Sequence, residues 1–391
     1  MIYLDHAATT ACAPEAVQAM LPYFTELFGN PSNIYGLSLK ARKAVNQARS
    51  EVAKAINAKL AAEITFTASG SEADNLAIIG IAKSRSEIGR HLITSRVEHH
   101  AVLNCFHMLE REGFKVTYLP VSKEGRVDPD SVAQAITKET TLISVMMANN
   151  EIGTLQPIAA IAEIAKKHGI YMHTDAVQAA GAMHIDVQEL GVDALSISAH
   201  KFYGPKGVGA LYLRQGCHPT PIILGGGQEK GLRSGTENVP GIIGLARALA
   251  LVNENGEAKR RCLTELREQL IEGVLARIPD VIVTGSRTER LPGMASFAVK
   301  GIEGESLVIQ LDRRGICASA GAACNTGQSG GSHVLNALGL PVSLTRGSLR
   351  LSLGYENTAE EIEQTISALA EAIELLRSVI PRRHGAGRKK A

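Results

Sequence analysis

The segment "DALSISAHKFYGPKGVGALYL" (residues 193–213) joins an apolar run to a loop that is rich in glycine. The run "ALSIS" has the length and bounded apolar character of a short buried strand. His200 and Lys201 follow it directly, where a strand gives way to a loop. A lysine at this point is a solvated surface group, a ligand for phosphate, or an amine that reacts, and the segment alone leaves all three open.

Short apolar runs alternate with amphipathic helical stretches on both sides of this segment. Runs of this kind occur at residues 63–66, 91–95, 115–120, 141–147, 170–175, 194–198 and 209–213. Near-continuous apolar strands separated by helices indicate a sheet that is covered on both faces. The sequence therefore predicts an α/β fold with a mainly parallel, seven-stranded sheet.

The pattern changes after about residue 250, where a long charged helix precedes apolar runs at 281–285 and 295–301 and a last helix from Ala359. We expect a large domain over residues 13–255 and a smaller α+β domain built from residues 1–12 and 256–380. The basic tail, residues 381–391, has few apolar residues to pack, so it is expected to be disordered.

The bulk composition narrows the class of protein. The chain has 391 residues, 45% hydrophobic and 20% charged, with a net charge of +2, which gives no support for binding nucleic acid or a membrane surface. No secretory signal and no apolar run long enough to cross a bilayer is visible. Six scattered cysteines without a Cys-x-x-Cys pair favour a reducing compartment. We expect a cytoplasmic protein.

Polar residues follow five of the predicted strands. Because ligands of open α/β sheets bind beyond the carboxyl ends of the strands, these five groups are predicted to share one pocket. They are Ser69–Ser71, Glu98–His100, Asn149–Glu151, Asp175 with Gln178, and His200 with Lys201.

Each group also has a structural interpretation. The turn at 69–71 suits either a plain helix cap or a phosphate, and it lacks the glycine spacing of nucleotide-binding loops. Asp175 is either part of a structural ion pair or a cap, or it is the partner of a buried cation such as a protonated pyridine nitrogen. His99 either satisfies its own helix start or stacks on a flat ligand. Adjacent histidines rarely face one ion, so no metal site is expected at His99 and His100.

Taken together, the groups favour a reactive role for Lys201. A lysine becomes nucleophilic when burial or nearby positive charge lowers its pKa. Pyridoxal phosphate needs an amine for a Schiff base, an acid beside its ring nitrogen and donors for its phosphate. Lys201, Asp175 and the turn at 69–71 offer these three groups.

At this point the chain resembles the pyridoxal-phosphate-dependent cysteine desulfurases of the class V aminotransferase fold. The likeness runs from "YLDHAATT" (3–10) to "LRLSLG" (349–354) and is carried by "SGSEADNLAI", "EHHAVL", "NNEIG", "TDAVQ", "SAHKFYGPKGVGALY", "RSGTENV" and "SHVLNALG". It implies the fold type I architecture of pyridoxal-phosphate enzymes. It also implies a homodimer that turns L-cysteine into L-alanine and passes the sulfur to an acceptor protein such as an iron–sulfur scaffold.

The resemblance implies a role for each matching residue. Lys201 would hold the cofactor and move the substrate's α-proton, with His99 stacked on the ring and assisting. Asp175 would pair with the ring nitrogen and Gln178 with the phenolic oxygen. The remaining roles are phosphate binding by Gly70, Ser71, Ser198, His200 and, from the neighbouring subunit, Thr236, and binding of the substrate carboxylate by Asn150 and Arg350.

Cys324 lies in "ASAGAACNTGQSGGSHVL", a run of small residues typical of a mobile loop. By resemblance its thiolate attacks the substrate sulfur and becomes a persulfide, and it is a candidate contact for a nascent iron–sulfur cluster. Cys317 and the other cysteines are interpreted as small buried hydrophobes.

Three other functions stay open at this stage. A selenocysteine lyase would use the same scaffold. A serine hydrolase is suggested by Gly327-Gln328-Ser329-Gly330-Gly331, although that motif requires a preceding buried strand and none is predicted there. A binding protein without catalysis would leave Lys201, Asp175 and Cys324 without a shared purpose.

Overall fold

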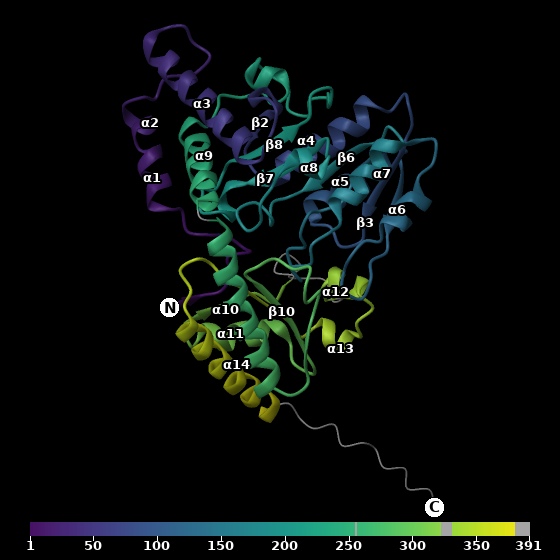
Figure 1. Ribbon diagram of the computed structural model, residues 1–391, viewed down its shortest axis with the longest axis vertical. Coiled ribbons are helices and arrows are strands. Elements are labelled where there is room, and N and C mark those ends of the chain that lie inside the picture. The colour runs from purple at the N-terminus through teal and green to yellow at the C-terminus, as the bar shows by residue number, and fades with distance from the viewer. Residues whose placement is uncertain (255, 322–330, 380–391) are drawn as a thin grey trace, which may run out of the picture.

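The computed structural model describes residues 1–254, 256–321 and 331–379, which form two lobes (Figure 1). The larger lobe is built around the predicted seven-stranded sheet. Its strand order is β2-β8-β7-β6-β5-β3-β4, and only β8 runs antiparallel to its neighbours. The strands are β2 (Ile64–Thr67), β3 (His91–Ser95), β4 (Lys115–Leu119), β5 (Thr140–Ser144), β6 (Tyr171–Asp175), β7 (Ala194–Ser198) and β8 (Gly209–Leu213). The predicted fold class is confirmed.

Helices cover both faces of this sheet, because successive residues of a strand point to opposite faces. In β3, Leu92 packs into the core beneath α4 (Gly70–Ser84) and α5 (His100–Arg111), while its neighbour Ile93 packs into the core on the other face. The core that contains Ile93 also contains buried residues of six helices. They are α1 (Pro14–Met20), α3 (Gly36–Ala55), α6 (Pro129–Ala135), α7 (Ile158–Lys167), α8 (Val187–Leu190) and α9 (Val239–Asn253).

Short helices complete the large lobe. They are α2 (Pro22–Thr25), η1 (Ala61–Glu63), η2 (Ala199–Lys201) and η3 (Gln228–Gly231). The expected helix cap at Ser69 is confirmed, because its side chain accepts a hydrogen bond from the Glu72 backbone N–H. Gly113 lies just beyond α5 with a φ of +87°, the left-handed conformation that ends a helix most easily when glycine supplies it.

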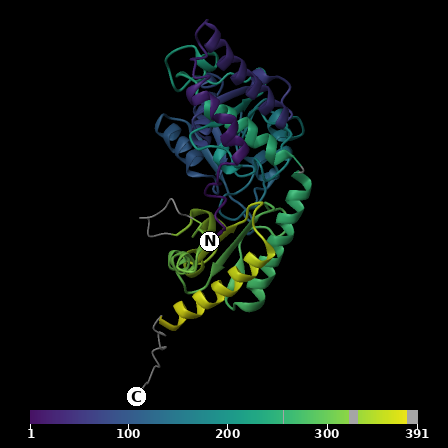
Figure 2. The ribbon, with the colours of Figure 1, turned by 90° about the vertical axis from the view of Figure 1, so that its left-hand side faces the viewer.

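The smaller lobe has its own sheet and its own core. Strands β9 (Val281–Val283), β10 (Met294–Val299) and β12 (Ser348–Ser352) form an antiparallel sheet, beside which β1 (Ile2–Tyr3) pairs in parallel with β11 (Ile316–Cys317). Helices α10 (Gly256–Arg277) and α14 (Ala359–Val379) pack side by side along this lobe (Figure 2). The lobe also contains α11 (Gly304–Asp312), α12 (His333–Ala337) and α13 (Val342–Thr345).

The division into domains at residues 12/13 and 255/256 is a proposal that the core packing supports. Ile2 and Leu4 belong to the small-lobe core, whereas Ala16 belongs to the core of the large lobe. The expected disorder of residues 381–391 concerns a segment outside the described residues. Across the described residues, none of the helices is long and apolar enough to cross a membrane.

Candidate active site

The five strand ends singled out in the sequence meet at one edge of the large sheet. They border a cavity of about 320 Å³ that the small lobe closes with Arg350 and Gly321. All predicted site residues except Thr236 and Cys324 line it, namely Gly70, Ser71, His99, Asn150, Asp175, Gln178, Ser198, His200, Lys201 and Arg350.

The Lys201 amine projects into this cavity from the short turn η2 after β7. Its Nζ donates hydrogen bonds to the backbone carbonyls of Ala7 (2.6 Å) and Ala8 (2.8 Å). The segment that carries these carbonyls is tied to the same turn, since the Thr10 backbone N–H donates to the carbonyl of His200 at 2.8 Å. The N-terminal segment "DHAATT" therefore holds the lysine in place.

Asp175 is the last residue of β6 and its side chain is buried. Its Oδ1 accepts a hydrogen bond from the Val177 backbone N–H at 2.8 Å. Burial raises the pKa of this carboxyl to about 6, although that hydrogen bond and the positive charge of Lys201 act in the opposite direction. An ionised carboxylate at such a place is stabilised by a cation, and a protonated ring nitrogen is a cation of suitable shape.

A second buried acid, Asp74, was missed in the sequence. It lies one helical turn after Gly70 on α4, so the i, i+4 spacing within "SGSEAD" places both residues on the side of the helix that faces the cavity. Its Oδ1 has no hydrogen-bond partner and lies 3.7 Å from Nε2 of His173. Burial, and then the charge of Asp175, raise the pKa of Asp74 well above its ordinary value. Burial and the neighbouring charge thus both favour the protonated form of Asp74.

The two histidines of the cavity are neutral at pH 7. His99 is the N-cap of α5, and its Nδ1 accepts from the Ala101 backbone N–H at 3.2 Å, which leaves the proton on Nε2. Burial, and then the charge of Lys201, lower the pKa of His99 to about 4. The same two causes lower the pKa of His200 to about 4, and its Nδ1 lies 3.2 Å from the Thr9 hydroxyl.

The start of α4 forms a cradle that only glycine allows at position 70. A Cβ atom there would lie 2.6 Å from Cγ2 of Val177 and 3.2 Å from Cβ of Ser198. Ser71, Ser198, His200 and the first residues of α4 line this cavity. This donor set fits a phosphate.

Arg350 reaches the cavity from β12 in the small lobe, where its side chain is 5% exposed. Its Nη1 donates to the backbone carbonyl of Asn150 and its Nη2 to Oδ1 of Asp5, both at 2.7 Å. Its Nε is buried without a hydrogen-bond partner. Asp5 was not predicted as a site residue, although it lies within the motif "LDHAATT" (4–10), which is part of the resemblance to the family.

The other two predicted residues lie elsewhere. Thr236 is exposed and does not line this cavity, and its expected role toward a neighbouring subunit stays a prediction. Cys324, like the Gly-x-Ser-x-Gly match at 327–331 apart from Gly331, falls outside the described residues. Among the described residues, no group of three or more His, Cys, Asp or Glu side chains is arranged to hold a metal ion.

Comparison with known proteins agrees with this geometry. The family model described as aminotransferase class-V matches residues 2–365. A protein named cysteine desulfurase IscS from Clostridium botulinum (strain Hall) is 51% identical over 382 residues, which cover 97% of this chain and 96% of the relative. The chain belongs to the cysteine desulfurases of the class-V aminotransferase family.

Solved structures support the same assignment for this desulfurase. A structure described as a NifS-like protein superposes with a TM-score of 0.90 at 35% identity, covering 96% of this chain and 100% of the other. A structure described as SspA in complex with cysteine superposes with a TM-score of 0.81 at 36% identity, covering 92% and 100% of the two chains. The desulfurase is thus an enzyme of a pyridoxal-phosphate-dependent family.

Proposed function

We propose that the cavity holds pyridoxal phosphate on Lys201 and uses it to remove sulfur from L-cysteine, leaving L-alanine and a persulfide on Cys324. The observation that carries this proposal is that Lys201, Asp175 and the cradle at Gly70 line one cavity. They supply an amine, an acid and a phosphate site, which are the three groups that the cofactor requires.

The residues that line the cavity fit this cofactor. Lys201 would join its aldehyde, and the buried Asp175 carboxylate would accept a hydrogen bond from its protonated ring nitrogen. Gln178 would contact its phenolic oxygen, while Ser71, Ser198 and His200 would bind its phosphate. When bound, the cofactor withdraws electrons from the substrate's α-carbon and so makes the α-proton acidic.

The substrate carboxylate is proposed to bind at Arg350. Its Nε has no hydrogen-bond partner, and a buried donor of this kind is costly unless a ligand satisfies it. The adjacent Asn150, whose carbonyl already holds the guanidinium, lines the cavity and would contribute its amide. Because Arg350 comes from the small lobe, substrate binding would draw both lobes together.

The proton transfers are proposed to use the neutral amine of Lys201 and the neutral imidazole of His99. The Lys201 amine would accept the α-proton of the substrate and return it later. His99 has its proton on Nε2 and stays neutral near pH 7, so it can stack on the ring and exchange that proton with the reacting sulfur.

The sulfur step itself requires a thiolate. Cys324 would attack the substrate sulfur while the Cβ–S bond breaks, so that the sulfur stays on Cys324 as a persulfide and the substrate carbon takes a proton to give alanine. A free thiol has a pKa of about 8.5, so this step needs an environment that favours the thiolate.

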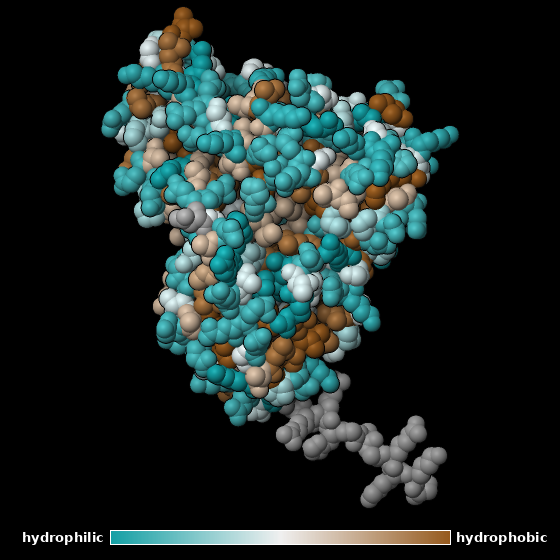
Figure 3. Space-filling view, in the orientation of Figure 1, coloured by the Kyte–Doolittle hydropathy of each residue, from teal (hydrophilic) through white to brown (hydrophobic). Residues whose placement is uncertain are grey.

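The enzyme is proposed to act as a homodimer, in which Thr236 of one subunit reaches the phosphate of the other. Large apolar side chains of the α2–α3 region are exposed, and they gather at one tip of the molecule (Figure 3). Apolar surface of this kind marks an interface. These side chains are Phe24, Phe28, Ile34, Tyr35 and Leu39.

Delivery of the sulfur to an acceptor protein is proposed to follow. An iron–sulfur scaffold is the expected acceptor, in which case Cys324 would contact a nascent cluster, and the cytoplasm is the expected compartment.

The test is turnover of L-cysteine with a reductant by the purified enzyme, with alanine and sulfide measured together. Equal amounts of both products are expected, with none from Lys201→Ala. Faster turnover of selenocysteine than of cysteine would instead favour the lyase, and a colourless protein without turnover would contradict the proposal.

A further inference from the structure

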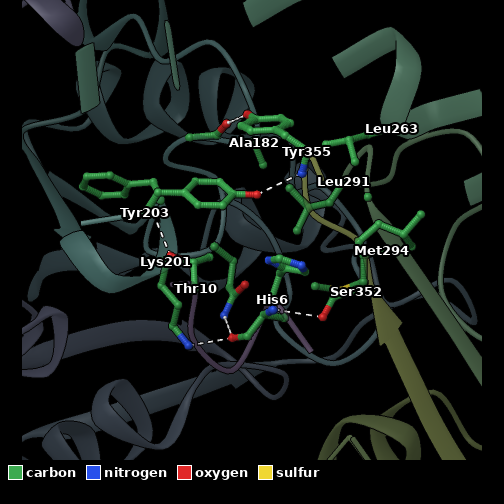
Figure 4. A pocket seen from close by; sticks show the side chains of 16 residues that line it. His6, Thr10, Ala182, Lys201, Tyr203, Leu263, Leu291, Met294, Ser352 and Tyr355 are labelled. Atoms are coloured by element: carbon green, nitrogen blue, oxygen red, sulfur yellow. Dashed lines mark hydrogen bonds between the residues drawn. The ribbon is translucent and has the colours of Figure 1, made fainter. Parts of the chain in front are cut away.

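A second, smaller cavity of about 70 Å³ lies next to the active site, between the two lobes (Figure 4). It shares Ala7, Gln178 and Lys201 with the cofactor cavity. Its other polar walls come from both lobes and are His6, Thr10, Tyr203, Ser352 and Tyr355. The functions proposed above leave this cavity unused.

His6 is the polar residue of this cavity that lacks well-formed hydrogen bonds. Its side chain is only 6% exposed, yet both of its ring nitrogens are buried without a hydrogen bond of good geometry. Buried polar atoms in folded proteins nearly always have a partner, and where protein supplies none, ordered water does. A water needs only about 10–15 Å³ of such space, so the cavity has room for several.

Tyr203, in the wall of this cavity, has a strained backbone conformation that its contacts hold in place. Tyr203, two residues after Lys201, has a φ of +63°, which is rare for a bulky residue. The Thr10 hydroxyl accepts from its backbone N–H at 2.7 Å, and its ring stacks on Tyr355 with centroids 5.3 Å apart. Strain of this kind persists only where the surroundings enforce it, and it is found at functional sites.

A path to solvent starts at the far side of His6. Its Nε2 lies 3.6 Å from Oε1 of Glu356, whose side chain is 53% exposed. The Tyr203 hydroxyl donates to the other oxygen of the same carboxylate at 3.1 Å. The order Lys201, cavity, His6, Glu356 therefore leads from a cavity that Lys201 helps to line to the surface.

We propose that water in this cavity, together with His6 and Glu356, carries protons between Lys201 and bulk solvent. Outward, an N–H bond breaks at Lys201 and its proton passes to a cavity water, which gives one of its own to a ring nitrogen of His6. The opposite ring nitrogen releases its proton to Glu356 and solvent, and a tautomer change restores His6. Each relay group ends with its original number of protons.

The charge state of His6 suits this task. Burial lowers the pKa of His6, although the charge of Glu356, a backbone interaction with Tyr3 and the charge of Asp5 act in the opposite direction. A neutral imidazole has one nitrogen that accepts and one that donates, which a relay requires. His6 would thus be a relay residue that never touches the substrate.

The inference rests on the proposed role of Lys201, and the test separates the two. Holoenzyme is incubated with L-alanine, the reaction product, in D₂O, and the loss of its α-hydrogen is followed by NMR. We expect His6→Phe, which keeps the ring, to slow this exchange by about 10-fold to 100-fold. His6→Gln, which keeps hydrogen-bonding groups, should restore at least part of the rate, and the exposed His168→Phe should change nothing.

Two further measurements distinguish a relay role of His6 from a merely structural one. The visible absorbance of the bound cofactor should be the same in His6→Phe as in the parent enzyme, and a high-resolution crystal structure should show water bonded to the His6 ring. Equal exchange in His6→Phe and the parent, or a dry cavity, would overturn the relay. Exchange that survives Lys201→Ala would instead overturn the proposed function.

Discussion

Replacing Asp175 with asparagine should stabilise the cofactor-free enzyme while weakening its hold on the cofactor. Burial raises the pKa of this carboxyl from an ordinary 3.8 to about 6, a change that corresponds to about 3 kcal/mol of penalty on the ionised form. An asparagine keeps the shape and can keep the hydrogen bond from Val177, but it has no charge to bury.

The sign of the pH dependence follows from linkage. Between pH 3.8 and about 6 the folded protein binds a proton at Asp175 that the unfolded chain has lost, so stability falls as pH rises through this range. Above about pH 6 the penalty on the ionised carboxylate is fully present. In that range the free energy of unfolding of Asp175→Asn should exceed that of the parent by up to about 3 kcal/mol. Below pH 3.8 that difference should vanish.

Urea unfolding of both cofactor-free proteins at pH 5 and pH 8 measures this difference. At pH 8 the variant should have the higher midpoint and yet lose pyridoxal phosphate faster on dialysis, because its ring nitrogen has lost its counter-charge. A variant that is no more stable than the parent at pH 8, and that retains the cofactor equally well, would refute the assignment of Asp175.

Three further substitutions test other parts of the site. Gly70→Ala should release the cofactor on dialysis, because its Cβ would lie 2.6 Å from Val177, whereas Gly36→Ala at the start of α3 meets nothing within 4 Å and should leave absorbance unchanged. Cys324→Ser should abolish alanine formation from cysteine while the cofactor's absorbance remains, and Cys317→Ser should keep full turnover; loss of activity in both would weaken the case for Cys324. Arg350→Lys should raise the KM for cysteine about 10-fold or more with little change in kcat, since an ammonium cannot bind a carboxylate bidentately, and an unchanged KM would place the carboxylate elsewhere.

The sheet could be predicted because its strands other than the edge strand β4 are almost wholly buried and five of the strands are followed by polar residues. The boundaries were less certain for physical reasons. The apolar run at 141–147 extends beyond the strand, since β5 ends at Ser144. After that residue the Met146 N–H donates to the Glu98 carboxylate. Helix α3 has no counterpart among the predicted elements, although its buried Ala41, Val45, Ala48 and Val52 follow helical spacing.

The cavity between the lobes could not be predicted from local sequence. Asp5 and His6 acquire their roles only when the N-terminal segment packs between β12 and the turn that carries Lys201. Their partners Arg350 and Glu356 stand about 350 positions later in the chain, and short-range periodicity carries no information about such contacts. Asp74 differs, since its i, i+4 relation to Gly70 is visible within one motif.

The central claim is that the ε-amine of Lys201 carries the cofactor. The most direct measurement is borohydride reduction of the purified enzyme, followed by proteolysis and mass spectrometry of the labelled peptide. The account predicts that the visible band is lost and that a reduced pyridoxal phosphate adduct is found on Lys201. An adduct on another lysine, such as the nearby Lys206, or no adduct at all, would contradict it.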